Sequence, residues 1–427
     1  MKTIGSLLFL LELLIYQPLV IAYPIDGTAL TGIERLEGYR EAQINKISGR
    51  ILPRGAQLPT AKVDLRLTKR PELALPAVDA NFTGEVVTLL QELSQGQADD
   101  FGISVLDLSD IEHPVYAEHR ADVRFNPGSV GKLAVAMGIF QALAQAYPDD
   151  IDARQRVLRE SQIVADEFIR KDHHKVPFWN SQQQRLYSRK LLEDDTASLW
   201  TYLDWMLSAS SNAAASMSMK HMMLLSQFGR DYPPDSEGER NYFSQTSRAE
   251  LGKLLARALR NGLNASGVDD NNFRQGGFFS STGKRRVPGL NSYATPRELM
   301  RFLLHLEQGK VVDDFSSREI KRLLYMTQRR IRYASSPALY DAAVYFKSGS
   351  YYRCRREADF KCRKYRGNEL NLLNSVATVE SPAGKPDGLF YMVVITSNVL
   401  KKNAALLHQN IGTRLHRLIE RRHAVRP

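Results

Sequence analysis

The spacing of hydrophobic and polar residues changes several times along the 427-residue chain, and each change marks a different predicted element. Residues 101–108, FGISVLDL, and residues 114–120, PVYAEHR, are short apolar runs on either side of a polar turn, which predicts a pair of strands. Three later apolar runs also predict strands: residues 341–350, 369–380 and 389–398. Two strands therefore precede a long middle segment, and three follow it.

The middle segment has the spacing of helices. From Ser129 the chain reads SVGKLAVAMGIF, which predicts a buried helix. Residues 196–225 keep helical spacing except for a break of small residues at 208–211, and residues 295–309 form a capped amphipathic helix. A last apolar stripe over residues 404–418 predicts a helix that closes the chain.

This order of elements predicts the fold class. Separate sheets of two and three strands would each leave exposed edges, so the distant strands are expected to share one sheet. We expect an α+β fold with a five-stranded antiparallel sheet flanked by helices and an inserted all-helical lobe. The domain would span residues 81–424, and a cleft belongs between the two layers. The predicted parts are a sheet lobe of residues 83–128 plus 340–422 and a helical lobe of residues 129–339.

The N-terminus has the pattern of an export signal. Residues 1–22 combine a basic start, an apolar run and a small-residue ending, which predicts a signal peptide. A membrane anchor is the alternative, but the run is short and contains Glu12 and Pro18. Residues 23–80 are rich in Pro, Gly and charge and are expected to be an extension or linker. We expect an exported, periplasmic or secreted protein that is not inserted in a membrane after signal removal.

Composition excludes several classes of function. The chain is 43% hydrophobic and 25% charged, as globular proteins are, and its net charge is +11. Lys and Arg are scattered, so nucleic-acid binding is not expected, and the short basic runs are interpreted as solvated surface. These runs cover residues 284–286, 329–332, 353–366 and 414–422.

The only two cysteines, Cys354 and Cys362, are predicted to form a disulfide because export exposes them to oxidising conditions. A zinc pair is the alternative, but no histidine lies beside them to complete a ligand set. His173 and His174 likewise have no partner at ligand spacing, so no metal is expected.

Ser129 and Lys132 are the first candidates for chemistry. At i and i+3 they share one helical face, so the amine could take the proton of the serine. The alternative is an ordinary helix cap with a lysine that reaches solvent. A second copy of this spacing, Ser281 to Lys284, lies among Gly, Pro and Arg, where no helix is expected to follow and the lysine is expected to be solvated.

Two further motifs follow in order. Ser210-Ser211-Asn212 lies at the small-residue break, and Lys347-Ser348-Gly349 lies at the end of the third strand. With Ser129-x-x-Lys132, this series resembles the penicillin-recognising serine hydrolases, the class A β-lactamases and penicillin-binding proteins, over residues 83–422. One departure is Ser211, where class A enzymes usually have Asp.

The resemblance implies a role for each motif residue. The implied catalytic residues are Ser129, Lys132, Ser210 and Lys347. The implied substrate-binding residues are Asn212, Ser348, Gly349 and Ser350. Ser129 would be the acylated nucleophile, Lys132 its base, and Ser210 a proton relay to the leaving nitrogen. The backbone N–H groups of Ser129 and Ser350 would form the oxyanion hole.

Class A enzymes also carry a deacylating glutamate. The only local look-alike here is Glu237, in the sequence EGERN. We expect a monomeric serine hydrolase without cofactor that forms an acyl-enzyme with β-lactams or related amides. One alternative is a D-alanyl-D-alanine peptidase or transpeptidase that acts on cell-wall peptides, which slow hydrolysis would suit. Another is a non-catalytic protein that binds such peptides.

Overall fold

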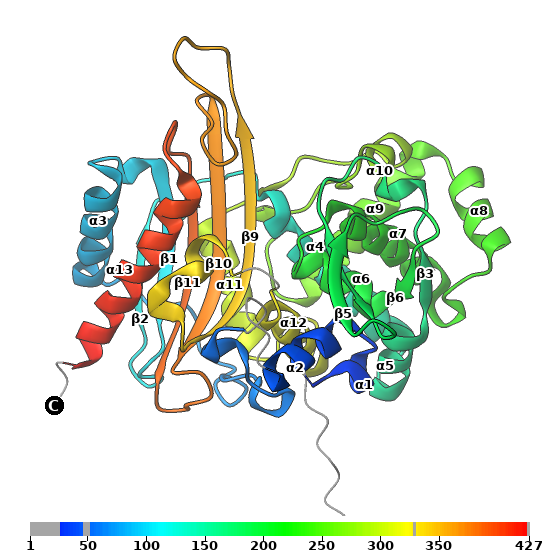
Figure 1. The fold of residues 1–427 in the computed structure, drawn as a ribbon, viewed down its shortest axis with the longest axis horizontal. Coiled ribbons are helices and arrows are strands. Elements are labelled where there is room, and N and C mark those ends of the chain that lie inside the picture. Colours follow the sequence, from blue (N-terminus) through cyan, green and yellow to red (C-terminus); the bar gives the residue numbers. More distant parts are fainter. Residues whose placement is uncertain (1–25, 46–51, 328–329, 425–427) are drawn as a thin grey trace, which may run out of the picture.

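The structure is a computed structural model that describes residues 26–45, 52–327 and 330–424; the predicted signal peptide lies outside the described residues. Five strands form one antiparallel sheet in the order β2-β1-β11-β10-β9 (Figure 1). This confirms the predicted α+β fold class and the shared sheet. The strands are β1 (Phe101–Asp107), β2 (Val115–His119), β9 (Ala343–Arg353), β10 (Leu370–Ser381) and β11 (Leu389–Ser397).

The central strands are apolar at almost every position because both faces of the sheet are covered. Alternate residues of β11 enter two different cores: Val393 and Ile395 pack on one face, and Met392 and Val394 on the other. Helices α3 (Ala80–Ser94) and α13 (Ala404–Ala424) contribute to the first core. Helices α11 (Pro296–Glu307) and α12 (Asp314–Tyr325) contribute to the second.

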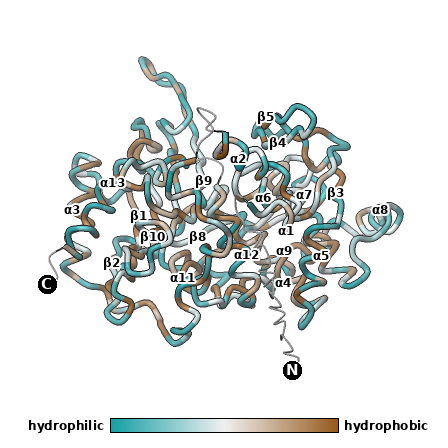
Figure 2. The backbone as a smooth tube through the Cα atoms, turned by 60° about the horizontal axis from the view of Figure 1, so that its bottom comes forward, coloured by the Kyte–Doolittle hydropathy of each residue, from teal (hydrophilic) through white to brown (hydrophobic). Residues whose placement is uncertain are grey.

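Helix α4 (Lys132–Ala146) is the centre of the helical lobe and contacts α7 and α9. The stretch Gly128–Ala146 has the length and apolar composition of a membrane span, but 72% of it is buried inside the protein. Figure 2 shows the contrast with α8 at the edge of the molecule, which is mostly hydrophilic. The other lobe helices are α5 (Ile151–Glu160), α6 (Leu199–Leu207), α7 (Asn212–Phe228), α8 (Ser236–Gln245), α9 (Arg248–Ala265) and α10 (Ser281–Arg286).

The helical lobe also contains short strand pairs that were not predicted, and one of them takes the first residues of the helical stretch 196–225. They are β3 (Gln162–Val164) with β6 (Thr196–Ser198), β4 (Val176–Asn180) with β5 (Arg185–Arg189), and β7 (Phe273–Arg274) with β8 (Tyr293–Ala294). Helix α10 corrects one expectation, because it begins at Ser281, where no helix was predicted. A cap explains it: Ser280 Oγ accepts a hydrogen bond from Gly283 N at 3.0 Å.

The described part of the N-terminal segment packs against the lobe and the sheet layer. It contains α1 (Thr28–Thr31) and α2 (Arg35–Ile44), and Arg35 donates to both carboxylate oxygens of Asp204 on α6 at 2.5 and 2.6 Å. Lys321 on α12 lies 2.8 Å from Glu307 and 2.8 Å from Glu380, and its Nζ also donates to Asp64 O at 2.6 Å. Buried ion pairs therefore connect this segment to α6 and connect α11, α12 and β10 to one another, and the hydrogen bond to Asp64 O joins the two groups.

The hairpin of β9 and β10 projects beyond the rest of the sheet (Figure 1). The predicted disulfide between Cys354 and Cys362 is present in its loop, with an S–S distance of 2.09 Å. Gly349 on β9 packs against the turn before α4, and this position requires glycine. A Cβ at Gly349 would lie 2.2 Å from Pro127 O, so only glycine lets the sheet and the lobe approach this closely.

Candidate active site

The turn that carries Ser129 is set by its neighbours. Gly128 has φ of +52°, a conformation that glycine adopts without strain, and residues Gly128–Gly131 form a 3-10 turn that continues into α4. Ser129 and Lys132 are therefore on successive turns of one helical segment. Lys132 Nζ lies 3.0 Å from Ser129 Oγ, within hydrogen-bond distance.

Lys132 has no exposed surface, and its amine is held by partners from the second motif. Nζ donates to Ser210 O at 2.6 Å and to Asn212 Oδ1 at 2.9 Å. Burial lowers the pKa of Lys132 to about 7, although the negative charge of Asp172 acts in the opposite direction. An amine with this pKa is largely neutral just above neutral pH, so it can accept a proton.

The second motif lies at the junction of α6 and α7. Ser210 has φ of +59°, an uncommon conformation for a residue other than glycine, and such strained positions cluster at functional sites. Ser211 caps α7 by accepting a hydrogen bond from Ala214 N at 3.1 Å. This turn directs the Ser210 hydroxyl to the third motif, where Lys347 Nζ donates to Ser210 Oγ at 2.9 Å.

Lys347 lies on β9, across from α4. Its Nζ also donates to Ser348 O at 3.1 Å. Burial holds the pKa of Lys347 well below its usual range, and the positive charges of Lys132 and Arg332 lower it further. The three motifs thus meet through direct hydrogen bonds, from Lys132 to Ser129, from Lys132 to Asn212, and from Lys347 to Ser210.

Two cavities open on Ser129. One of about 510 Å³ is lined by Ser129, Asn212 and Gln275, and one of about 560 Å³ lies between β9 and the end of α6 and is lined by Ser129, Ser210 and Lys347. Among the described residues, no Asp or Glu lines either cavity. Cations do: Lys284 in the first cavity, and Lys347, Arg332 and Lys364 in the second. The site favours an anionic ligand.

The structure also brings together the substrate-binding candidates. Ser348, Gly349 and Ser350 line the second cavity, and Ser350 lines the first as well. The backbone nitrogens of Ser129 and Ser350 lie at the same junction, since a Cβ at Gly349 would approach Ser129 N to 2.9 Å and a Cβ at Gly128 would approach Ser350 N to 3.3 Å.

Glu237 is placed elsewhere. It lies in the first turn of α8, its side chain is exposed, and it lines neither cavity. The hydrogen bonds of Ser129 and Lys132 do not include it. The structure does not bring this glutamate together with the three motifs.

Arg332 is a cavity residue that the sequence did not single out. It has φ of +58° and is 8% exposed, and its Nη2 donates to Ser350 Oγ at 3.2 Å and to Tyr365 OH at 3.0 Å. Its Nε and Nη1 are buried without a hydrogen-bond partner among the described residues. Unpaired buried donors are costly, so they mark a place for an acceptor from a ligand. The basic run at 329–332 was the available signal, but it was interpreted as surface.

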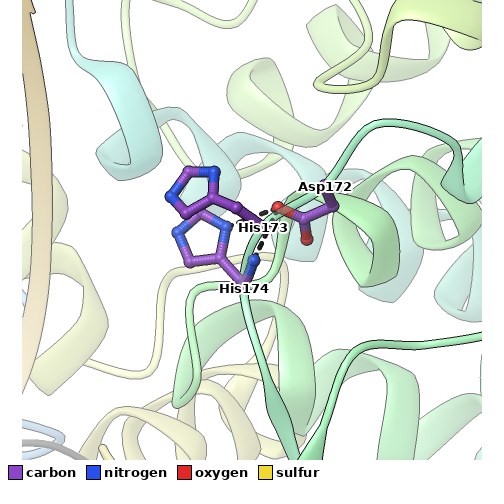
Figure 3. Close-up of side chains that lie close together, drawn as sticks. All are labelled: Asp172, His173 and His174. Atoms are coloured by element: carbon purple, nitrogen blue, oxygen red, sulfur yellow. Dashed lines mark hydrogen bonds and ion pairs between the residues drawn. The ribbon is translucent and has the colours of Figure 1, made fainter.

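A carboxylate completes the surroundings of His173 and His174. Asp172, His173 and His174 have possible ligand atoms within 4.8 Å of one another (Figure 3), so the sequence analysis was wrong to give the histidines no partner. Asp172 Oδ1 lies 2.6 Å from His174 Nδ1. Its Oδ2 accepts hydrogen bonds from Ser211 Oγ and Ala213 N, both at 2.9 Å. Both carboxylate oxygens of Asp172 thus already have partners within the protein, so a cation that bound here would have to displace those partners.

Comparisons with known proteins identify the family. The β-lactamase enzyme family matches residues 85–419. No curated protein matches the chain. A class A β-lactamase structure from Bacteroides cellulosilyticus is similar over 79% of this chain and 98% of its own, with 14% identity and a TM-score of 0.50. A β-lactamase from Chitinophaga pinensis has 16% identity and a TM-score of 0.47 over 80% and 100% of the two chains. A penicillin G acyl-enzyme of a PBP-A mutant has 12% identity and a TM-score of 0.49 over 82% and 100%.

Proposed function

The chain belongs to the β-lactamase enzyme family and is a serine hydrolase that acts on amide bonds, and from this premise we propose that it forms an acyl-enzyme on Ser129 with β-lactam or related amide substrates. The observation that carries the proposal is the 3.0 Å contact between Ser129 Oγ and the amine of Lys132, a lysine whose pKa burial lowers to about 7. A neutral amine at that distance is a general base for the hydroxyl.

The proposed reaction uses each motif once. Lys132 Nζ takes the proton of Ser129 Oγ as the oxygen attacks the amide carbon, and the oxyanion forms near the backbone N–H groups of Ser129 and Ser350. The C–N bond then breaks, Ser210 Oγ gives its proton to the leaving nitrogen, and the proton that Lys132 took from Ser129 replaces it, so that Lys132 is neutral again. The hydrogen bond from Lys347 to Ser210 Oγ supports this relay. Water releases the acyl group and restores Ser129.

The substrate is proposed to be anionic. A substrate carboxylate would be attracted by Lys347 and would meet the unpaired N–H groups of Arg332. Asn212 would hold the substrate amide while its Oδ1 remains near Lys132.

One observation favours a second candidate, a D-alanyl-D-alanine peptidase or transpeptidase that acts on cell-wall peptides. Deacylation by water needs a base, and among the described residues no carboxylate lines either cavity. An acyl-enzyme without that base would persist, which suits transfer of the acyl group better than rapid hydrolysis.

We also propose that the protein is exported. The pattern of residues 1–22 and the disulfide between Cys354 and Cys362 both support an oxidising compartment outside the cytoplasm. Cell-wall peptides and β-lactams would be within reach there.

A fluorescent penicillin with intact-mass detection tests the proposal. The expected result is one label per chain on Ser129 and no label on Ser129→Ala, whose melting temperature stays within a few degrees of the wild type because only one hydroxyl is lost. Ser281→Ala is the matched control, since it alters the second Ser-x-x-Lys copy and should leave labelling unchanged. Rapid release of the label indicates a β-lactamase, and a persistent adduct indicates the peptidase. An unlabelled wild type would favour a non-catalytic binding protein.

A further inference from the structure

The carboxylate of Asp172 has no role in the reaction proposed above, yet it is buried beside the second motif. It lies in the loop before β4, and its side chain is 4% exposed. An ionised carboxylate offers about four lone-pair positions. Here Oδ1 is within hydrogen-bond distance of His174 N at 3.1 Å and His174 Nδ1 at 2.6 Å, and Oδ2 accepts from Ser211 Oγ and Ala213 N. Four protein donors or ring nitrogens thus surround the carboxylate, and Figure 3 shows those of His174.

Two of these donors flank the residue that contacts the catalytic lysine. Ser211 and Ala213 lie on either side of Asn212, whose Oδ1 is 2.9 Å from Lys132 Nζ. Both contacts go to a single oxygen, Oδ2, so they fix the backbone at the start of α7 against the loop. A shift of this turn would also move Ser210 O, which lies 2.6 Å from the same amine.

The charge of Asp172 is retained at neutral pH. Burial alone would raise the pKa of this carboxyl, but the hydrogen bond and charge of His174 and the Ala213 N–H together hold it well below its usual range. The negative charge acts on Lys132 and raises the pKa of that amine against the effect of burial. The other titratable groups that act on this cluster are His173, His174 and Lys347.

We propose that Asp172 is a positioning residue for the acylation of Ser129: it supplies, from a separate loop, the carboxylate that class A enzymes carry inside the second motif, where this chain has Ser211. It holds Ser210 and Asn212 on the amine of Lys132 through the start of α7. It also provides a negative charge near that amine. The inference rests on the proposed function, because it concerns the same acylation step.

Moving the carboxylate tests the inference. Asp172→Asn keeps the shape but removes the charge and leaves only one acceptor oxygen. Acylation by the fluorescent penicillin should slow by about tenfold to a hundredfold, because a small misplacement of a reacting group has effects of that size. The acid limb of the pH profile should move down by about 0.5 to 1 unit, because Lys132 loses the charge that raises its pKa. Adding Ser211→Asp should restore both the rate and the limb.

Two matched variants separate positioning from charge and from general stability. Ser211→Ala removes the hydrogen bond to Asp172 and the cap of α7 but leaves the carboxylate, so the rate should fall while the acid limb stays in place. Asp166→Asn changes another carboxylate of the same segment, which caps a 3-10 turn and pairs with Lys220 away from both cavities. It should lower the melting temperature and leave the pH profile unchanged.

The outcomes distinguish this inference from the proposed function. A wild type that takes no label overturns the proposed function and the inference with it. A labelled wild type whose Asp172→Asn variant has the same rate and pH profile overturns the inference alone. A lower melting temperature with an unmoved acid limb, or a double variant that recovers neither property, also overturns it. If Asp172→Asn does not fold, the double variant carries the test against the wild type.

Discussion

The proposed chemistry depends on Lys132. Burial of a charged amine is costly, and it favours the neutral form that the proposed reaction needs. A charged amine without exposed surface would pay a large desolvation cost. The three hydrogen-bond partners of Nζ come from Ser129, Ser210 and Asn212, so the charge has no direct carboxylate partner at hydrogen-bond distance. In the proposed reaction, the protein gives up stability at this position and gains a base that works near neutral pH.

The first prediction is a pH profile governed by this amine. Because the neutral form of Lys132 is the active one, acylation should rise with pH through about 7 and level off above it. At one pH unit below the pKa, the rate should be about a tenth of the plateau, which follows from the fraction of neutral amine. The measurement is the second-order labelling rate of the fluorescent penicillin between pH 5.5 and 8.5.

Lys132→Ala provides the check on that assignment. Loss of the base should slow labelling by about a hundredfold to ten-thousandfold and remove the limb near pH 7. A variant that keeps the same acid limb would assign the base to Lys347, whose amine donates to Ser210 Oγ and lines the second cavity.

At the scale of elements, the segment between β7 and α10 lies against the turn that carries Ser129. Gln275 lies in this segment and lines the cavity that also contains Ser129 and Asn212. Its side chain covers the first turn of α4, since a Cβ at Gly131 would lie 1.9 Å from Gln275 Oε1. A carboxamide cannot take a proton from water at neutral pH, so this position is filled by a group without basic function.

The second prediction is that Gln275→Glu shortens the lifetime of the acyl-enzyme. A carboxylate of nearly the same shape would be close enough to the start of α4 to activate a water, and a general base contributes about a hundredfold or more. Release of the fluorescent acyl group should become at least about tenfold faster in a single-turnover experiment, while labelling changes little. Gln275→Leu is the control, because it keeps the size and adds no base. Equal lifetimes for the two variants would mean that the water that releases the acyl group does not approach Ser129 from the side of residue 275.

Elements with a regular period were predictable from the sequence, and contacts across the fold were not. The runs 101–108 and 389–398 became β1 and β11 because a strand covered on both faces is apolar at every position. The break at 208–211 was visible as small residues, and it became the turn that carries Ser210. The side-chain hydrogen bonds among the three motifs depend on tertiary packing, and only the resemblance to a known family connected them beforehand.

Asp172 and Arg332 show why the rest could not be predicted. Asp172 acts on residues about 40 positions away, and nothing in its local sequence marks a carboxylate that a distant helix start will bury. Arg332 belongs to a basic run typical of surface, but it is buried and contacts Ser350 and Tyr365, which lie 18 and 33 positions later in the chain. Helix α10 was missed for a different reason, since a single serine cap outweighed the Gly and Arg residues around it.

At the scale of the whole molecule, the positive charge is concentrated beside the site on the β9–β10 hairpin. The basic arm, defined here as residues 353–366, projects from the sheet and is closed by the disulfide (Figure 1). Seven cationic side chains on it are exposed: Arg353, Arg355, Arg356, Lys361, Arg363, Lys364 and Arg366. Lys364 also lines the second cavity, so the field of the arm reaches the site directly.

The third prediction is that this arm raises the local concentration of anionic substrates. Exposed charges are screened within about 10 Å at 0.1 M salt, so labelling by an anionic penicillin should slow by about threefold between low and high salt. Replacing Arg355, Arg356 and Arg363 by Ser should lower the rate at low salt and remove most of this salt dependence. Labelling rates measured over a salt series at fixed pH provide the comparison.

A second basic run supplies a control of equal charge. Arg414, Arg417 and Arg421 are exposed on α13, which packs with α3 on the face of the sheet away from the helical lobe (Figure 1). Replacing these three arginines by Ser changes the net charge by the same amount, and none of the three lines either cavity. The salt dependence of this variant should match the wild type. If both triple variants lose the salt dependence equally, the salt dependence comes from the net charge of +11 and not from the basic arm in particular.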